Sequence, residues 1–214
     1  MGTIKKGILG GFSGKVGTVV GASWKGIAYM RSLPQSVKNP RTEPQRRQRS
    51  KFALALGVLK PMTALLRTGW KLYAHRQSPF NAATAYTLAN AITGTYPAYE
   101  IAPDKILVSR GSLTPAANPH ITATMGNMEF QWEDNSGTGS ATQTDKTLIA
   151  ILNLAKGEAI TGTAGAERAE EAQTVPIPAD WAGDEVHAYL GFISEDGNEI
   201  ANSVYLGTAT VTQA

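Results

Sequence analysis

The residues best suited to chemistry in this chain are bases concentrated in one short stretch. Arg46 and Arg49 stand three residues apart and Arg47 and Lys51 four apart, so in a helix each pair shares one face. Glu43 is the single acid within residues 1–80, so the bases have few nearby partners in sequence. The pattern therefore favours an anionic partner over an ordinary solvent-exposed helix face. The complete cluster is Lys38, Arg41, Arg46, Arg47, Arg49 and Lys51.

Two kinds of anionic partner fit this cluster. A nucleic acid would be bound through its phosphates in a salt-sensitive, sequence-independent way, and no recognition-helix or RNA-binding signature accompanies the bases. A protein surface would supply carboxylates, and complementary charge of this kind gives specificity between proteins. We favour the protein interface because the acidic half of the chain offers such a surface. A nucleic-acid-binding module that uses residues 38–51 is the alternative.

The glycine-rich stretch GGFSGKVG, residues 10–17, invites comparison with a phosphate-binding loop. Such a loop needs two glycines separated by four residues, followed by Lys and then Ser or Thr. Here three residues separate Gly10 from Gly14, and Val16 follows Lys15. The glycines are better explained by a β-hairpin or an extended arm, in which they allow positive φ and close backbone approach.

A group of oxygen-bearing side chains could be imagined as a calcium loop, because hard cations prefer clustered oxygen ligands. The residues are Glu133, Asp134, Asn135 and Asp145. Their spacing matches no EF-hand, and the sequence Asp-Asn-Ser-Gly is typical of a turn between two strands. We expect a turn here and no metal.

Catalytic side chains are not arranged in any recognised spacing. His75, His120 and His187 are far apart, and Glu170 and Glu171 lie in a polar stretch. No Ser-centred nucleophile elbow occurs, and the lack of cysteine excludes thiolate chemistry and disulfides. We therefore expect no catalytic residue, no cofactor and no enzyme activity. His187 alternates with apolar neighbours, so it should face solvent or a sheet neighbour.

The charges of the chain are divided unevenly along its length. Residues 1–80 hold 15 of the 20 Lys and Arg and one acid, a net charge of +14. Residues 81–214 hold 5 bases and 16 acids, a net charge of −11. This asymmetry favours either a head that binds polyanions or subunits that associate basic end to acidic end.

The elements that carry the bases are a hairpin and helices. Strands are expected over Val16–Ala22 and Gly26–Arg31, with a turn near residues 23–25. The proline-rich segment 32–44 should be an extended connector that ends at Thr42, the expected helix N-cap. A long amphipathic helix interrupted at Pro61 follows, and a second helix is expected over Phe80–Ile92, capped by Ser78 or Asn81 and ended by Gly94. The apolar stripe of the long helix is Phe52, Leu56, Leu59, Thr63, Leu66, Trp70 and Tyr73.

After Tyr96 the sequence changes to short apolar runs separated by turn residues, which is typical of an all-β domain. Trp132 and Tyr205 are candidate core aromatics of a sandwich. The clearest hairpin turns at Asp196-Gly197. Strands are expected near Lys105–Leu113, Ile121–Thr124, Met128–Glu133, Thr147–Asn153, Ala159–Thr163, Glu171–Pro176, Val186–Ser194 and Ser203–Val211.

These elements predict an α+β protein with two domains. Residues 1–100 would form a basic region with a glycine-rich β-hairpin arm, a long kinked helix and a second helix. Residues 101–214 would form an acidic β-sandwich that resembles an immunoglobulin-like or fibronectin type III domain. A secretory signal requires an apolar run after its first charges, whereas glycines interrupt the segment after Lys6. We expect a protein that is cytoplasmic when synthesised and does not enter a membrane.

Four segments together resemble an uncharacterised bacterial and phage-associated family, a domain of unknown function. They are GTIKKGILGGFSGKVGTVVGASWKGIAYMRSLP, NPRTEPQRRQRSKFAL, FQWEDNSGTGSATQTDK and SEDGNEIANSVYLG. The most specific elements are WKG, NPRT with the QR that follows, and DNSG with the later TDK. The resemblance spans nearly the whole chain and implies no known activity. It associates the chain with proteins carried by phages and prophages.

These observations predict a non-enzymatic structural protein that self-associates through its basic arm and helix. The host assembly suggested by the resemblance is a virion or phage-like particle, and the expected partners are further copies or other structural proteins of the particle. A third hypothesis, ligand binding by exposed aromatics of the sandwich, rests on Trp181 alone. The expected interface residues are Lys5, Lys6, Lys15, Lys25, Arg31, Lys38, Arg41, Arg46, Arg47, Arg49 and Lys51.

Overall fold

The computed structural model describes residues 2–4, 7, 10–24, 26–36, 39 and 41–212. The chain forms two compact units, Met1–Thr42 and Glu43–Ala214. The N-terminal unit is a four-stranded antiparallel sheet in the order β1 (Thr3–Ile4), β2 (Phe12–Val16), β3 (Val19–Trp24) and β4 (Ile27–Ser32).

The predicted single hairpin in this unit is therefore a meander of four strands. Val16 ends β2 and pairs with Val19 of β3, so the first predicted strand contains a turn at Gly17. Gly17 has φ +57°, a backbone conformation that a residue without Cβ adopts readily. The second turn follows Trp24, which still pairs with Ile27, and so lies later than predicted.

The long helix is interrupted as predicted. Helix α1 (Glu43–Leu59) begins directly after Thr42, and the 3₁₀ turn η1 (Lys60–Met62) contains Pro61. Helix α2 (Thr63–Gly69) and the 3₁₀ turn η2 (Lys71–Tyr73) follow. The predicted apolar stripe is only partly correct, because Phe52 and Tyr73 are 44% and 40% exposed. The buried residues of α1 are Ala55, Val58 and Leu59.

Helix α3 (Pro79–Asn90) begins at the predicted N-cap, where the Ser78 hydroxyl accepts a hydrogen bond from the Asn81 backbone N–H. It ends earlier than predicted, because Ile92 and Gly94 belong to strand β5 (Ile92–Thr95). Strand β6 (Ala98–Ile101) pairs with β5 in a two-stranded hairpin. Gly94, with φ +77°, lies within β5 and is therefore not the residue that ends α3.

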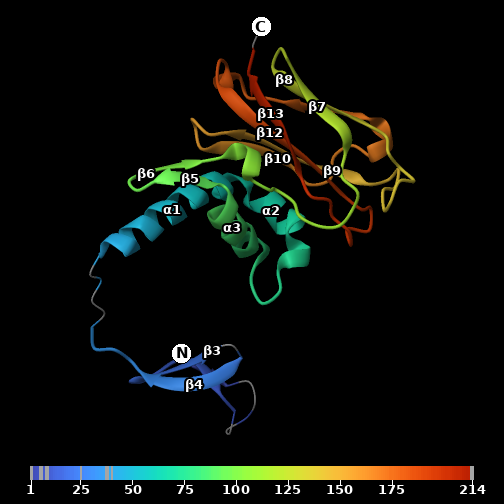
Figure 1. The fold of residues 1–214 in the computed structure, drawn as a ribbon. Helices are drawn as coiled ribbons and strands as arrows, with labels where there is room; N and C mark the ends of the chain where they lie inside the picture. The colour runs from blue at the N-terminus through green and yellow to red at the C-terminus, as the bar shows by residue number, and fades with distance from the viewer. Residues whose placement is uncertain are drawn as a thin grey trace. The chain divides into compact units, whose positions relative to one another are not determined.

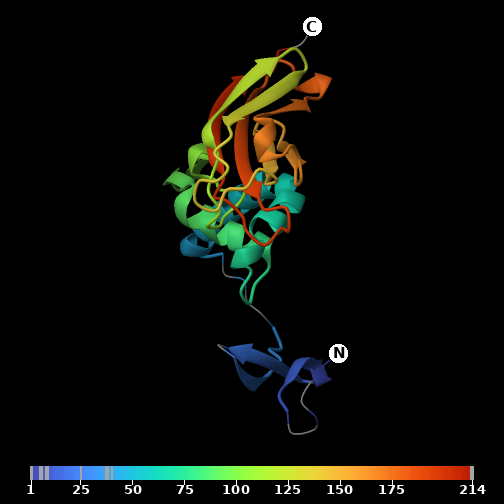
Figure 2. The ribbon, with the colours of Figure 1, turned by 90° about the vertical axis from the view of Figure 1, so that its right-hand side faces the viewer.

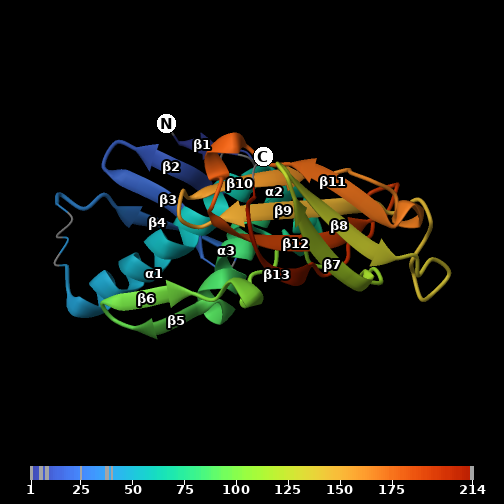
Figure 3. The ribbon, with the colours of Figure 1, turned by 90° about the horizontal axis from the view of Figure 1, so that it is seen from above.

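The C-terminal half is a sandwich of two antiparallel sheets, as Figures 1 and 3 show. One sheet has the order β10 (Glu158–Gly162), β9 (Lys146–Asn153), β12 (Glu185–Ile193), β13 (Val204–Thr210). The other has the order β11 (Ala172–Pro176), β8 (Asn127–Glu133), β7 (Ala117–Thr124). All seven strands match predicted ones. The chain crosses between the two sheets, which gives the predicted sandwich of immunoglobulin-like, fibronectin type III-like form. The fold class is α+β.

The predicted strand at Lys105–Leu113 is absent from this described segment. The segment opens with the 3₁₀ turn η3 (Pro103–Lys105) and then continues without a ladder. Its backbone N–H groups have scattered partners: those of Val108 and Ser109 donate to the Ser203 hydroxyl, and those of Arg110 and Leu113 donate to the carbonyls of Gly69 and Ile200. Two further 3₁₀ turns, η4 (Arg168–Glu170) and η5 (Ala179–Trp181), lie in later connections.

The helices cover the outer face of the four-stranded sheet, so this unit has three layers (Figures 1 and 2). Residues of α1 and α2 share one core with Leu148 and Tyr189 of the sheet. The opposite face of the same strands packs on the three-stranded sheet through a second core that includes Trp132 and Phe192. Strands β9 and β12 are therefore buried on both faces, which explains their almost continuous apolar sequences.

The shared core explains why the chain divides at Thr42 and not near residue 100, where the sequence analysis placed the boundary. The helices of the expected first domain bury their apolar faces against the sheet of the expected second domain. None of the described strands of the N-terminal sheet contributes to this core or to the second one. Within the described residues, no helix is both long enough and apolar enough to cross a membrane.

Candidate interaction site

Helix α1 presents most of the predicted basic cluster on its first turns. Arg46, Arg47 and Arg49 are exposed, and Lys51 is half-buried. Arg41 precedes the helix with φ +49°. Glu43 lies in the first turn, where a carboxylate suits the positive end of the helix dipole. The cluster thus lies at the N-terminal end of α1, whereas the C-terminal end of the helix packs in the core.

The β5–β6 hairpin binds one side of this cluster. Arg47 pairs with Glu43 at 2.5 Å, and its guanidinium lies 5.9 Å from the centre of the Tyr96 ring. The Lys51 ammonium lies 4.9 Å from the centre of the Tyr99 ring. Arg47 and Lys51 therefore share one side of the helix, as predicted, and both have partners within the chain. Each exposed cation–π contact contributes about 0.5–1 kcal/mol.

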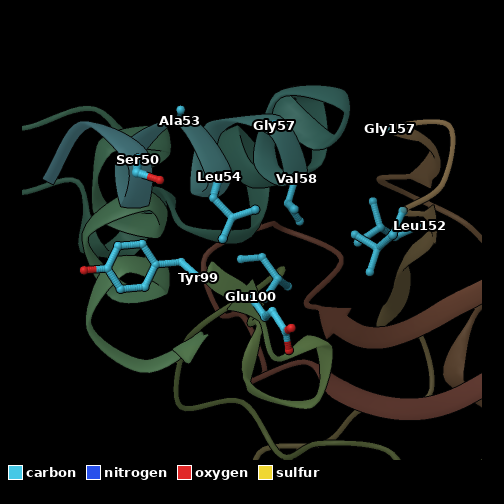
Figure 4. Close-up of a pocket in the computed structure, with 11 residues that line it drawn as sticks. Ser50, Ala53, Leu54, Gly57, Val58, Tyr99, Glu100, Leu152 and Gly157 are labelled. Carbon is cyan, nitrogen blue, oxygen red and sulfur yellow. The ribbon is translucent and has the colours of Figure 1, made fainter. Parts of the chain in front are cut away.

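A groove of about 660 Å³ begins beside these contacts (Figure 4). Its walls are helix α1, strand β6 and the turn between β9 and β10. Gly57 leaves the helix side open, since a Cβ placed there would meet no atom within 4 Å. Apart from Tyr99, Glu100 and Ser50, the lining is aliphatic or glycine: Ala53, Leu54, Gly57, Val58, Ile101, Leu152, Leu154 and Gly157.

The groove is suited to binding and not to bond-making chemistry. It offers one carboxylate, Glu100, and two hydroxyls, with no histidine or base placed to activate either hydroxyl. Its size and apolar lining are typical of sites that accept small apolar molecules or side chains of a partner. Sequence analysis missed it, because its three walls come from segments about fifty residues apart.

The N-terminal sheet carries two further predicted residues on one face. Lys15 pairs with Val20, and Val20 pairs with Arg31, so their side chains lie on the same side of the sheet. Tyr29, Trp24 and Ile27 lie on this side by strand alternation and are 44%, 62% and 66% exposed. We call this surface the basic face. The predicted residues Lys5, Lys6, Lys25 and Lys38 lie outside the described residues.

The predicted interface residues therefore fall in two separate units. Lys15 and Arg31 belong to the N-terminal sheet with Arg41 in the same unit, and the other described bases belong to α1. The unit Met1–Thr42 contains seven Lys and Arg and no acid. The unit Glu43–Ala214 contains 13 bases and 17 acids.

Acidic side chains line a hollow of about 500 Å³ on the sandwich. Glu195, Asp196 and Glu199, from the turn after β12, form one wall, and the loop around Thr142 forms the other. Hydrogen bonds from Ser194 and from Asn198 lower the pKa of Asp196, which therefore stays ionised. This hollow offers three carboxylates to a basic partner, with the Lys71 ammonium close to Asp196.

Two of the four residues considered for calcium, Asn135 and Asp145, belong to a buried polar centre, whereas the carboxylates of Glu133 and Asp134 accept hydrogen bonds from Asn118 and Ser136. Asp145 is fully buried and pairs with the guanidinium of Arg168 at 3.0 Å, and its other oxygen accepts from the Thr142 hydroxyl. The Asn135 amide oxygen accepts from Arg168 at 2.5 Å. Burial lowers the pKa of Arg168, although Asp145 opposes this effect. These oxygens already have donors, and within the described residues no three His, Asp or Glu side chains converge on a metal position.

The arginine also receives contacts from other parts of the chain. Its guanidinium donates to the carbonyls of Thr114 and Pro115, and it lies 3.9 Å from the centre of the Phe192 ring. The Trp132 indole donates to the Arg168 carbonyl at 2.7 Å. The DNSG and TDK motifs thus supply Asn135 and Asp145 to one buried polar network, which accounts for their combination without catalysis.

Other singled-out residues have structural roles. His187 is 8% exposed and hydrogen bonds to the Tyr205 hydroxyl on the neighbouring strand at 3.0 Å, so the sheet-neighbour alternative is confirmed. Glu170 closes a capping box at η4, and Glu171 accepts from the Asp134 N–H. Trp181 is 2% exposed, so the hypothesis of an exposed ligand-binding aromatic at this position is wrong. Packing against the sandwich core buries the ring.

Comparisons with known proteins complete this description. No curated protein matches the chain in sequence. Among solved structures, the fn3 domain of the human collagen alpha-1(XX) chain is similar, with 14% identity, a TM-score of 0.34, and coverage of 50% of this chain and 93% of that domain. A model of a family of unknown function, DUF6266, matches residues 11–207. The chain therefore belongs to the family of unknown function DUF6266.

Proposed function

We propose that this protein is a non-enzymatic assembly protein whose basic surfaces bind the acidic sandwich of a neighbouring copy. The observation that carries the proposal is the division of charge between the two units. Seven bases and no acid lie in Met1–Thr42, whereas the acids of the chain all lie in Glu43–Ala214. A head-to-tail contact of this kind is heterologous and can extend into a larger assembly.

The two basic surfaces and the acidic hollow provide chemistry for this contact. The basic face displays Lys15 and Arg31, and the start of α1 displays Arg46 and Arg49 on the side away from the tyrosines. Glu195 and Glu199 are exposed at the hollow. Charged residues at the rim of an interface act mainly on association rate and specificity, so the assembly should depend strongly on salt.

A charge-swap experiment tests the proposal with the full chain. Light scattering at about 0.1 M salt, where the Debye length is about 10 Å, should give species larger than one chain of 22.7 kDa. The double variant Arg46→Glu/Arg49→Glu should give smaller species than the unchanged protein under the same conditions. Adding the Glu195→Lys/Glu199→Lys variant, whose charges are reversed on the other partner surface, should restore the large species. A wild-type protein that remains one chain at every salt concentration contradicts the proposal.

The alternative function is binding of nucleic acid, and the basic face gives it a specific observation. Trp24 and Tyr29 stand on the same face as Lys15 and Arg31, and single-stranded nucleic acids bind to such mixtures of bases and exposed rings. Fluorescence anisotropy with a labelled single-stranded oligonucleotide measures this directly. Salt-dependent binding that Tyr29→Ala weakens, with no association of protein alone, would favour the alternative.

The host assembly that we propose is a virion or phage-like particle. The support is the resemblance of the R-x-x-P and NPRT pattern, which begins at Arg31, to proteins carried by phages and prophages. Electron microscopy of particles from a phage that encodes the chain, with an antibody to the sandwich, tests this step. Label on intact particles supports the virion, and label confined to unassembled protein contradicts it.

A further inference from the structure

The face of the N-terminal sheet opposite the basic face is apolar. Phe12 pairs with Ile4, Val16 pairs with Val19, and alternate residues along each strand share a side. Met30 pairs with Gly21 and therefore lies on this same side. We call this surface the apolar face; its residues in the described strands are Ile4, Phe12, Gly14, Val16, Val19, Gly21, Ser23, Ala28, Met30 and Ser32.

The large side chains of the apolar face are open to solvent. Ile4 is 54% exposed, Val16 55% and Met30 70%. Phe12 is half-buried because its ring lies against Gly21, where a Cβ would come within 2.6 Å of the ring.

A single-layer sheet of this size needs a second layer to be stable. A sheet buries its apolar face against another element, and folding units near 40 residues usually depend on oligomerisation or a cross-link. The chain contains no cysteine, so a disulfide is not available. Contiguous exposed apolar surface of this kind marks a contact with a partner.

The distribution of charge identifies the partner. The described residues of the apolar face include no Lys, Arg, Asp or Glu, although the unit as a whole carries seven bases. An acidic partner would be drawn to Lys15 and Arg31 on the other face. An uncharged face can instead meet a copy of itself without bringing bases together, and the basic faces then point outward on both sides.

We propose that the apolar face pairs with the same face of a second copy, forming an isologous two-layer sandwich at the centre of a dimer. The inference rests on the proposed function in assigning self-association to this unit, and it adds the surface and the symmetry of the contact. Each dimer presents two basic faces outward, so the charge-dependent contact can join one dimer to the next.

A small hollow on the unit fits this pairing. It has a volume of about 220 Å³, and its lining combines Phe12, Ala28 and Met30 of the apolar face with Tyr29 of the basic face and with Gly10 and Gly11, which precede β2. Gly11 keeps it open at Ala28, because a Cβ at Gly11 would collide with the Ala28 methyl. An isologous contact places one apolar side chain of each copy in the hollow of the other, and the flexible Met30 at the rim can adapt to it.

Cross-linking tests the inference, because any cysteine introduced becomes the only thiol of the chain. The full-length variant Met30→Cys is treated with a short bismaleimide at about 1 M salt, where the Debye length is about 3 Å and charge-dependent contacts are screened. It should give a covalent dimer of twice 22.7 kDa. The matched control Arg31→Cys, one residue away on the basic face, should give little.

The outcomes separate this inference from the proposed function. Equal cross-linking of the two variants, or none, overturns the apolar-face dimer. If the large species at low salt persist in that case, the charge-dependent assembly stands alone. Val16→Asp gives a second measurement: light scattering at about 1 M salt should show a shift from two chains to one, because a charge on the apolar face must be desolvated in the dimer. An unchanged dimer mass in this variant also overturns the inference.

Discussion

At the scale of single residues, Arg168 joins several segments of the sandwich through buried polar contacts. Its side chain is fully buried, and it connects Asp145 and Asn135 with the carbonyls of Thr114 and Pro115. Removing one partner of a buried ion pair leaves the other charge unpaired in a low-dielectric interior. We expect Arg168→Met to lower the free energy of unfolding by about 3–5 kcal/mol, measured by urea denaturation.

The matched control for this prediction replaces both charges. In Arg168→Met combined with Asp145→Asn, no unpaired charge remains, so the loss should be smaller than in the single variant. A double variant that is less stable than Arg168→Met would show that the ion pair itself does not dominate the network.

His187 gives the sandwich a dependence on pH. Burial lowers the pKa of His187 below its ordinary value of 6.5, with Glu185 acting in the opposite direction. The unfolded chain therefore binds this proton more readily than the folded chain as pH falls through about 6.5, and stability decreases toward acid. This loss of stability is complete once the pH falls below the pKa of His187 in the folded state.

Urea denaturation on both sides of that pH measures the effect. The loss of stability between about pH 7.5 and about pH 5.5 should be smaller in His187→Asn, whose amide can keep a hydrogen bond with Tyr205. His120→Asn, at an exposed position, serves as the control and should behave like the unchanged protein. An identical pH dependence in His187→Asn would assign the effect to other groups.

On the scale of elements, two helical glycines with opposite surroundings report on the groove and the core. Gly57 of α1 has open space beside it, whereas a Cβ at Gly69 of α2 would come within 2.9 Å of Ser109. Alanine loses less backbone entropy than glycine in a helix. Gly57→Ala should therefore raise the free energy of unfolding by about 0.5–1 kcal/mol.

Gly69→Ala is the matched control and should destabilise the protein by about 1–3 kcal/mol, because the segment around Ser109 must move. Chemical denaturation of the two variants beside the unchanged chain makes the comparison. A loss of stability in Gly57→Ala would mean that the groove is narrower in solution than its 660 Å³ indicates.

For the molecule as a whole, the division into two units makes a prediction about folding. Both apolar cores lie within Glu43–Ala214, and the N-terminal sheet contributes to neither. We expect the fragment 43–214 to keep the secondary structure and the main thermal transition of the full chain, measured by circular dichroism. A fragment that fails to fold would show that the N-terminal unit stabilises the larger one.

The same fragment should associate less than the full chain at low salt. It lacks the seven bases of the N-terminal unit and carries a net charge of −4, so copies of it repel one another more than they attract. Light scattering compares the two proteins at equal concentration. Equal association would place the contact entirely within residues 43–214.

The sequence by itself determined features that depend on neighbours in the chain. Helix α1 begins after Thr42, the chain bends at Pro61, and α3 begins at the Ser78 cap, because caps and prolines act within one turn. Alternation of apolar residues identified seven sandwich strands, and counting of charges showed the basic and acidic halves. Local patterns were less reliable at Lys105–Leu113, where hydrogen bonds to several separate segments hold the chain without a ladder.

Only the tertiary structure decided which surfaces are covered. Texture along the chain predicts the sandwich as a domain of its own, although the unbroken apolar run Leu148–Leu152 is typical of a strand buried on both faces. Packing of the helices on that strand moved the boundary to Thr42 and formed the groove beside Gly57. Asn135, Asp145 and Arg168 are separated in sequence, and only the fold brings them together. Burial is a sum over distant segments, so residue spacing does not specify it.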